Sequence, residues 1–130
     1  MKKVFLGGTC NGSNWREPVI DKLTIDYYNP VGEIWTAEMK KEEIRQREEC
    51  DYCLYVLTPK MNGFYSVAEI VDDSNKRPGK TIFCYLVTDE ELTFNDVQIR
   101  SLEQVAKMVV KNGAKFFNSL DDVVNFINHQ

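Results

Sequence analysis

Short apolar segments alternate with longer amphipathic segments along the chain, and this alternation restricts the fold more than any other feature of the sequence. The short segments have the length of strands, and the longer ones repeat their apolar residues with the period of a helix. The expected strands are residues 4–7, 25–28, 52–57, 81–87 and 115–117. Strands separated by helices form a parallel sheet that is covered on both faces. The pattern therefore predicts an α/β fold with a five-stranded parallel sheet.

The segments between these strands are expected to be helices. They cover residues 15–23, 36–49, 66–75, 97–111 and 120–128. Asn112 and Gly113 form a helix stop, and Ser119 is expected to begin the last helix. We expect the acidic loop 88–96 to be a mobile surface segment. The sequence has no internal repeat, low-complexity run or linker, so residues 1–130 are expected to form a single domain.

The composition is that of a soluble protein, with 43% hydrophobic residues, 28% charged residues and a formal net charge of −4. An acidic domain without a block of Lys or Arg is poorly suited to a phosphate backbone, so we expect no nucleic acid partner. No apolar run approaches the ~20 residues of a membrane span. The first apolar segment breaks at Gly7 and Gly8, too soon for a signal peptide. We therefore expect no membrane partner and a cytoplasmic location.

The four cysteines are expected to be reduced and to lie mostly in the core. Cys50 and Cys53 form a C-x-x-C motif, but it lies at the end of a helix and the start of a strand. A redox motif follows a strand and begins a helix, so this pair is on the wrong side. A zinc site would need further ligands, and the only histidine, His129, is next to the C-terminus. We therefore expect no metal and no redox cofactor.

Glu69 is the candidate catalytic residue with the most informative position. It follows the strand 52–57 across a loop that contains Gly63, near the first turn of the next helix. Ligands bind at this carboxyl edge of open α/β sheets, and a carboxylate there can act as a nucleophile or a base. Ser66 and Glu69 also have the S-x-x-E spacing of a capping box, in which the glutamate only binds the N-cap amide. The spacing alone favours the cap and leaves catalysis open.

The loop 7–16, after the first strand, is a second candidate site. Its glycines let the backbone approach a ligand, and Ser13 or Asn14 can cap the next helix. Arg16 supplies a planar donor for a phosphate or a carboxylate. The loop matches neither G-x-G-x-x-G nor a P-loop, and a glycine-rich turn with an N-cap needs no ligand. Both interpretations stay open at this point.

Two further groups of residues are weaker candidates. The charged helix 36–49 is typical of a solvated helix with i,i+4 ion pairs. One of its acids could face the site, but periodicity does not say which. Aromatic rings near the ligand edge suit stacking on a nucleobase, although they also fill small α/β cores. These aromatic residues are Trp15, Tyr27, Tyr28, Trp35, Phe64 and Tyr65.

Five segments occur in a specific order and spacing. They are VFLGGT (4–9), GSNWR (12–16), YNP (28–30), DYCLYVLTP (51–59) and YSVAE (65–69). Together they resemble the nucleoside 2-deoxyribosyltransferase-like family, and more narrowly its small bacterial and phage branch. The resemblance runs from residue 2 to about residue 86. It implies a flavodoxin-like, Rossmann-like three-layer sandwich, and a homo-oligomer whose sites are completed across subunits.

The resemblance also implies an enzyme that cleaves the N-glycosidic bond of a (deoxy)nucleoside or (deoxy)nucleotide through a glycosyl-enzyme intermediate. Glu69 stands ten residues after Pro59, where the family has its nucleophile, which reverses the preference and leaves the cap to Ser66. Glu43, eight residues before Asp51, stands where the family has an aspartate that assists the departing base. The sugar then passes to another base in a transferase, or to water in a hydrolase.

Further residues are expected to contact this small-molecule substrate. They are Gly8, Thr9, Asn11, Ser13, Arg16, Trp35, Asn62 and Ser66. Trp35 falls where the transferases have a tryptophan beside the base. Ser13, Arg16 and Ser66 are the expected phosphate contacts if the protein is a nucleotide N-glycosidase.

The sequence departs from the family at two positions near the expected site. Gly63 stands where the family has an acid that recognises the base, and Phe5 stands where the transferases have a tyrosine near the nucleophile. Asn112 is the nearest candidate for the asparagine that a neighbouring subunit contributes. These departures leave an alternative function, a non-catalytic nucleotide-binding or sensor module on the same fold.

Overall fold

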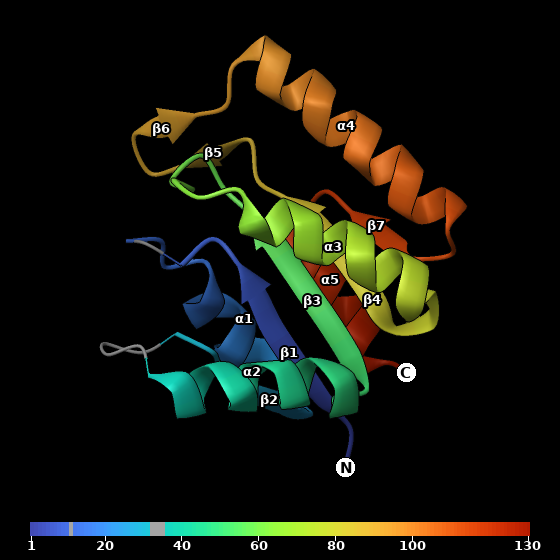
Figure 1. Cartoon of the computed structure of the whole chain (residues 1–130). Coiled ribbons are helices and arrows are strands. Elements are labelled where there is room, and N and C mark those ends of the chain that lie inside the picture. The colour runs from blue at the N-terminus through green and yellow to red at the C-terminus, as the bar shows by residue number, and fades with distance from the viewer. Residues whose placement is uncertain (11, 32–35) are drawn as a thin grey trace.

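A five-stranded parallel sheet forms the centre of the fold (Figure 1). The computed structural model describes residues 1–10, 12–31 and 36–130. The strands are β1 (Lys3–Gly8), β2 (Asp26–Tyr28), β3 (Tyr52–Leu57), β4 (Thr81–Tyr85) and β7 (Lys115–Phe117). Their order is β2-β1-β3-β4-β7, with parallel pairing throughout. This is the flavodoxin-like order, so the predicted α/β fold class is confirmed.

Five α-helices cover both faces of the sheet. They are α1 (Arg16–Lys22), α2 (Ala37–Glu49), α3 (Tyr65–Lys76), α4 (Asp96–Lys111) and α5 (Leu120–Asn128), and the 3-10 helix η1 (Pro78–Lys80) precedes β4. Figure 1 shows α2, α3 and α4 in front of the sheet and α1 and α5 behind it. Most element bounds agree with the sequence pattern to within a residue, and β4 ends two residues earlier than expected. No helix within the described ranges has the length and apolarity needed to cross a bilayer.

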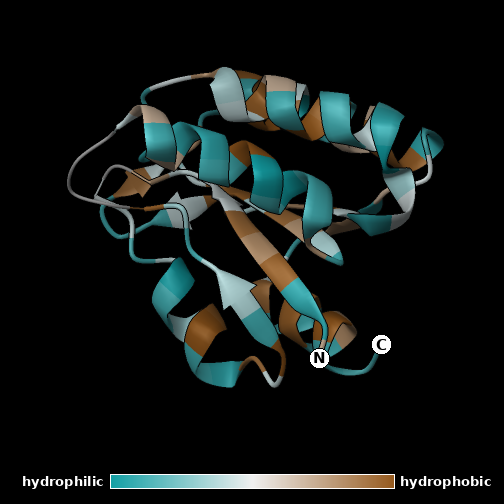
Figure 2. Cartoon of the chain, turned by 60° about the horizontal axis from the view of Figure 1, so that its bottom comes forward, coloured by the Kyte–Doolittle hydropathy of each residue, from teal (hydrophilic) through white to brown (hydrophobic). Residues whose placement is uncertain are grey.

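Strand β3 divides the interior into two apolar cores. All six of its residues are buried. Cys53, Tyr55 and Leu57 belong to the core under α3 and α4, whereas the alternate residues belong to the core under α1 and α5. A strand covered on both faces carries no charged residue, which is why β3 stands out in the sequence. Figure 2 shows hydrophobic residues on the strands of the sheet and mainly hydrophilic residues on the outer sides of the helices. Cys53 and Cys84 are buried free thiols, and burial raises the pKa of each to about 12.

The segment 88–96, expected to be a mobile loop, instead contains a short antiparallel hairpin of β5 (Thr88–Asp89) and β6 (Leu92–Thr93). Ser13 donates its hydroxyl to Asp89 at 2.5 Å, and Lys60 forms an ion pair with Glu90 at 2.5 Å. Phe94 is buried at the end of the hairpin. The acidic side chains thus have partners in the loops before α1 and α3, which the local sequence does not reveal.

Two expected helix caps are wrong. Helix α1 begins after Trp15 without a side-chain cap, so neither Ser13 nor Asn14 has that role. Helix α3 begins after Phe64, also without a side-chain cap. Ser66 is then the second residue of α3, too far into the helix to be its N-cap, and Ser66 and Glu69 form no capping box. Ser119 does cap α5, accepting a hydrogen bond from the backbone N–H of Asp122 at 3.2 Å.

Candidate active site

A cavity of about 510 Å³ opens at the carboxyl ends of β1 and β3. The chain leaves β1 towards β2 on one side and leaves β3 towards β4 on the other. Ligands of open α/β folds bind at such a switch point. The lining residues come from the ends of β1 and β3, from the loops after β1, β2 and β3, and from α1, α2 and α3: Gly7, Gly8, Thr9, Cys10, Gly12, Arg16, Pro30, Val31, Glu43, Leu57, Met61, Asn62, Gly63, Tyr65, Ser66 and Glu69.

Gly8 and Thr9 join the ends of β1 and β3 beneath the cavity. Gly8 has a φ of +110°, and a Cβ added there would lie 2.1 Å from the carbonyl oxygen of Val56. Thr9 donates its N–H to Val56 at 2.9 Å, and its hydroxyl accepts from the N–H of Thr58 at 3.0 Å. Because only glycine allows this close approach of the two strands, Gly8 determines the shape of the cavity floor.

Arg16 lines the cavity, but most of its donors are used by the loop after β1. Its Nε donates to the carbonyl of Leu6 at 3.1 Å, and one terminal nitrogen donates to the carbonyl of Thr9 at 2.6 Å. The Trp15 indole donates to the same Thr9 carbonyl at 2.7 Å. Burial lowers the pKa of Arg16 to about 10. The side chain therefore stabilises the loop, and its contact with a phosphate stays a prediction.

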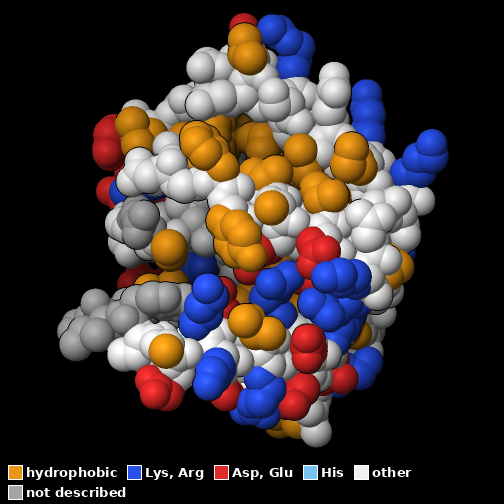
Figure 3. Space-filling view, in the orientation of Figure 1, with side chains coloured by type: hydrophobic (Ala, Val, Ile, Leu, Met, Phe, Trp, Pro, Cys, Tyr) orange, Lys and Arg blue, Asp and Glu red, His pale blue; other side chains and the backbone are white. Residues whose placement is uncertain are grey.

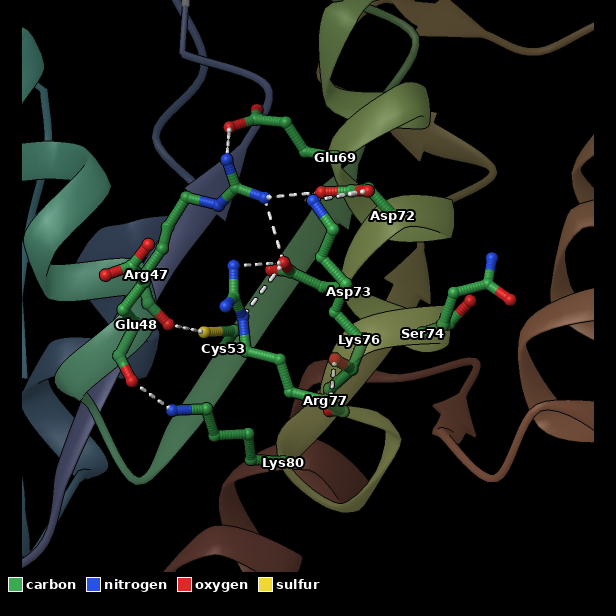
Figure 4. Close-up of polar contacts among 12 residues, drawn as sticks. Arg47, Glu48, Cys53, Glu69, Asp72, Asp73, Ser74, Lys76, Arg77 and Lys80 are labelled. Carbon is green, nitrogen blue, oxygen red and sulfur yellow. Dashed lines mark hydrogen bonds and ion pairs between the residues drawn. The ribbon is translucent and has the colours of Figure 1, made fainter.

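Glu69 points into this cavity from the second turn of α3. Its side chain is 11% exposed and forms an ion pair with Arg47 at 3.3 Å (Figure 4). Burial raises the pKa of Glu69 to about 7; Arg47 opposes this rise, and Glu43 and Asp73 add to it. A carboxylate with this pKa is partly ionised and partly protonated at neutral pH, which is the range that acid–base and nucleophilic chemistry uses.

Glu43 is the acid of α2 that faces the cavity. Burial raises its pKa, with Arg47, Arg16 and Lys40 opposing the rise. The neighbouring acids behave differently, because Glu42 and Glu49 both form ion pairs with Arg45 on the exposed side of the helix. The structure thus decides the question that helical periodicity left open.

Arg47 is the residue of this region that sequence reasoning missed. It lies behind Glu69 and contacts Glu69, Asp72 and Asp73 on α3 (Figure 4). The available signal was the i,i+4 spacing of Glu43 and Arg47 on α2, repeated by Glu69 and Asp73 on α3. That spacing is compatible with one charged face on each helix, but it does not indicate that the two faces meet.

The structure places most of the other expected substrate contacts in the cavity and one of them outside it. Gly8, Thr9, Arg16, Asn62 and Ser66 all line the cavity. Ser13 is not among the lining residues, and its hydroxyl is bound to Asp89. Asn11 and Trp35 lie outside the described residues.

The two departures from the family pattern also have clear positions. Gly63 lines the cavity, and a Cβ added there would meet nothing within 4 Å. Phe5 is buried and stacks on Tyr28, with 5.9 Å between ring centroids. Asn112 donates to Ser74 at 3.0 Å, at the opposite end of α3 from the cavity.

Within the described residues, no group of three or more His, Cys, Asp or Glu side chains is arranged to hold a metal ion.

Comparison with known protein families identifies the family of this chain. The family model described as nucleoside 2-deoxyribosyltransferase like matches residues 1–86. The chain belongs to the nucleoside 2-deoxyribosyltransferase-like family. The matched region contains β1 to β4 and α1 to α3, and therefore every residue that lines the cavity of this family member. A search of curated proteins found no match.

Proposed function

We propose that this member of the family cleaves the N-glycosidic bond of a (deoxy)nucleoside or (deoxy)nucleotide, with Glu69 as the nucleophile and Glu43 as the acid and base. The observation that supports this proposal most strongly is that these two carboxyl groups, from different helices, line one cavity at the carboxyl edge of the sheet. Two carboxyl groups across one site are the arrangement that retaining glycosidases use. The family match supports the same class of substrate.

In the first step, a carboxylate oxygen of Glu69 attacks C1′ of the sugar. The C1′–O bond forms as the C1′–N bond breaks, and the bonding electrons leave with the base. The carboxyl group of Glu43 gives its proton to the departing base. The raised pKa of Glu43 supports this role, because a buried carboxyl group keeps its proton closer to neutral pH.

In the second step, a water molecule or an incoming base attacks C1′ of the glycosyl ester. The bond between C1′ and the Glu69 oxygen breaks, and its electrons return to the Glu69 carboxylate. Glu43, now ionised, takes the proton that the attacking molecule loses. Water as the acceptor gives a hydrolase, and a base gives a transferase.

The decisive experiment measures base release from deoxynucleosides and deoxynucleoside 5′-monophosphates, with and without a second free base. We expect Glu69→Gln to lose base release, whereas Glu38→Gln, an exposed acid in the first turn of α2, retains it. A 2-deoxy-2-fluoro nucleoside is expected to leave a covalent adduct on Glu69, detected by peptide mass spectrometry.

Equal turnover by the wild type and Glu69→Gln would refute the assignment of the nucleophile. Binding of nucleotides without any turnover by the wild type would instead favour the non-catalytic nucleotide-binding module. Both outcomes are read from the same samples, since binding is measured by calorimetry on the protein used in the assay.

We also propose that the protein is a homo-oligomer, as the resemblance implies. Phe64 and Tyr65 support this, because they are 78% and 75% exposed at the start of α3, beside the cavity. Figure 3 shows apolar side chains gathered on the upper part of this face and charged ones over α2. Large exposed apolar groups of this kind mark contact surfaces. Light scattering coupled to gel filtration tests the proposal, and a monomer at high micromolar concentration would refute it.

A further inference from the structure

The guanidinium of Arg47 is held by close contacts with Tyr55, Asp73 and Glu69, and of these three partners Glu69 lines the cavity. Its Nε donates to the hydroxyl of Tyr55 at 3.0 Å, and one terminal nitrogen donates to Asp73 at 2.9 Å. The other terminal nitrogen lies 3.3 Å from Glu69. The guanidinium plane is rigid, so contacts at Tyr55 and Asp73 determine the direction in which the third nitrogen points. Figure 4 shows Arg47 reaching from α2 towards α3, with Glu69 at its far end.

Asp73 is the anchor of this arrangement. Its side chain is 0% exposed and also accepts from Arg77, at 2.9 Å and 3.1 Å, and from the hydroxyl of Tyr55. Arg77, the C-cap residue of α3, lies four residues after Asp73, so the chain brings the two side chains together. We call Arg47, Tyr55, Asp73 and Arg77 the Arg47 cluster. A buried carboxylate with this many donors is held in one position.

The charges of the Arg47 cluster do not cancel. Arg47 and Arg77 bring two positive charges, and Asp73 brings one negative charge. Asp72 lies farther from Arg47, at 3.8 Å, is 45% exposed and has its own partner in Lys76 at 3.1 Å. The remaining positive charge therefore faces Glu69, which lies at 3.3 Å and is 11% exposed.

We propose that Arg47 is a positioning residue for Glu69: it orients the carboxylate towards the cavity and places a fixed positive charge beside it. This inference rests on the proposed role of Glu69 as the nucleophile. Arg47 is not among the described residues that line the cavity; it lines an adjoining hollow that shares Tyr65 and Glu69 with the cavity, and its contact on the cavity side is with Glu69. A charge-assisted contact from a fixed guanidinium is well suited to hold a carboxylate in one orientation.

The same contact affects both chemical steps. When Glu69 becomes an ester, its negative charge is lost, but Tyr55 and Asp73 still hold Arg47 in place. The carboxylate that leaves in the second step returns to a cation that has not moved. A preorganised charge of this kind needs no rearrangement at the moment of reaction. Loss of Arg47 is therefore expected to slow the release of the sugar from Glu69 as well as its capture.

The charged surroundings of Glu69 make this inference measurable. Arg47 and Glu43 approach it from α2, and Asp73 lies on its own helix. Arg16 lines the same cavity from α1. Burial makes the largest contribution and raises the pKa of Glu69. Arg47 lowers this pKa, whereas Glu43 and Asp73 raise it further. Removing Arg47 alone must therefore shift the titration of Glu69 upwards.

The test is an NMR titration of the Glu69 carboxyl carbon, assigned by comparison with Glu69→Gln, in the wild type and three variants. We expect Arg47→Met to raise the Glu69 pKa by about 1 unit or more, the usual effect of losing an adjacent opposite charge. Arg47→Lys keeps the charge but loses the planar fork, so its shift is expected to be smaller. Arg45→Met removes an exposed arginine of the same helix and is expected to shift nothing.

Activity profiles give the second readout. In Arg47→Met, the rise of kcat with pH is expected to move upwards with the Glu69 pKa, while KM stays within about twofold, since Arg47 does not line the cavity. Arg47→Lys is expected to lower kcat at every pH and to leave the position of the rise near that of the wild type. If Arg47→Met does not fold, the lysine variant decides, and an unchanged kcat in it overturns the proposal.

The outcomes separate this inference from the proposed function. An unchanged Glu69 titration in folded Arg47→Met, with turnover still lost in Glu69→Gln, refutes the role of Arg47 and leaves the nucleophile intact. If the Glu69 pKa of Arg47→Met is shifted from that of the wild type, but the wild type releases no base, the contact is supported and the proposed function is refuted. An equal fall of kcat at all pH values in Arg47→Met means a purely structural role and also overturns the proposal.

Discussion

The carboxylate of Glu69 lies 3.3 Å from the guanidinium of Arg47, and each side chain is 11% exposed. The two residues come from different helices, α3 and α2, and 22 positions of sequence separate them. The Coulomb attraction in an ion pair this shielded from water is stronger than in a surface pair. The contact places the positive charge of Arg47 next to Glu69, the proposed nucleophile, which lines the cavity.

The activity of the wild type is expected to rise with pH through about 7, because Glu69 must be ionised to attack and its pKa is about 7. The Glu43 carboxylate raises that pKa, so Glu43→Gln is expected to move the rise to lower pH. The same variant loses the proposed proton donor, which lowers the maximal rate by roughly 10²–10⁴-fold. A profile of kcat/KM against pH for both proteins checks the two effects, and a rise at unchanged pH in Glu43→Gln would contradict the coupling.

Stability is expected to depend on Glu69 in the opposite direction from activity. Its pKa is raised from 4.5 to about 7 in the folded protein, so the folded state binds more protons than the unfolded state between these values. The free energy of unfolding therefore falls as pH rises through this window, by about 3 kcal/mol for this shift. Glu69→Gln is expected to remove this slope and to be no less stable than the wild type above pH 7. Urea unfolding at a series of pH values measures it, and an unchanged slope would refute the raised pKa.

Asp73→Asn is expected to destabilise the protein strongly, by roughly 3–5 kcal/mol, because it leaves Arg47 and Arg77 without their buried anion. Asp72→Asn is the matched control, one residue away on the same helix but 45% exposed. We expect its effect to stay within about 1 kcal/mol, as for other exposed ion pairs. Chemical denaturation of both variants at pH 7.5 gives the comparison, and similar losses in the two would show that the Arg47 cluster is not a buried charge network.

Gly8→Ala is expected to disrupt the floor of the cavity. The new Cβ would lie 2.1 Å from the backbone of Val56, and the φ of +110° is unfavourable for any side chain. The joined ends of β1 and β3 have to separate, so we expect a large loss of stability and of ligand binding. Gly63→Ala is the control in the same cavity, with no atom within 4 Å of the new Cβ. Melting temperatures of the two variants test this, and a Gly8→Ala protein as stable as Gly63→Ala would contradict it.

The elements of the fold could be predicted because each depends on a local pattern. The run 52–57 is apolar on both faces, as a central parallel strand must be, and the helices repeat their apolar residues every three to four positions. The position of Glu69 followed from the same logic, since the residues after a parallel strand meet at one edge. The expected caps at Ser13 and Ser66 failed, because the helix starts at Arg16 and Tyr65 are decided by packing and not by the nearest hydroxyl.

The sequence by itself thus determined the alternation of strands and helices, the edge of the sheet where the cavity opens, and one carboxylate at that edge. Only the tertiary structure decided which charges meet there. Arg47 contacts Asp73, 26 residues away, and Ser13 contacts Asp89, 76 residues away. Such pairs depend on how the helices and loops pack around the sheet. The local sequence around a charged residue is the same whether its side chain faces water or a buried partner. Burial is therefore what separated Glu43 and Arg47 from the solvated charges of the same helix.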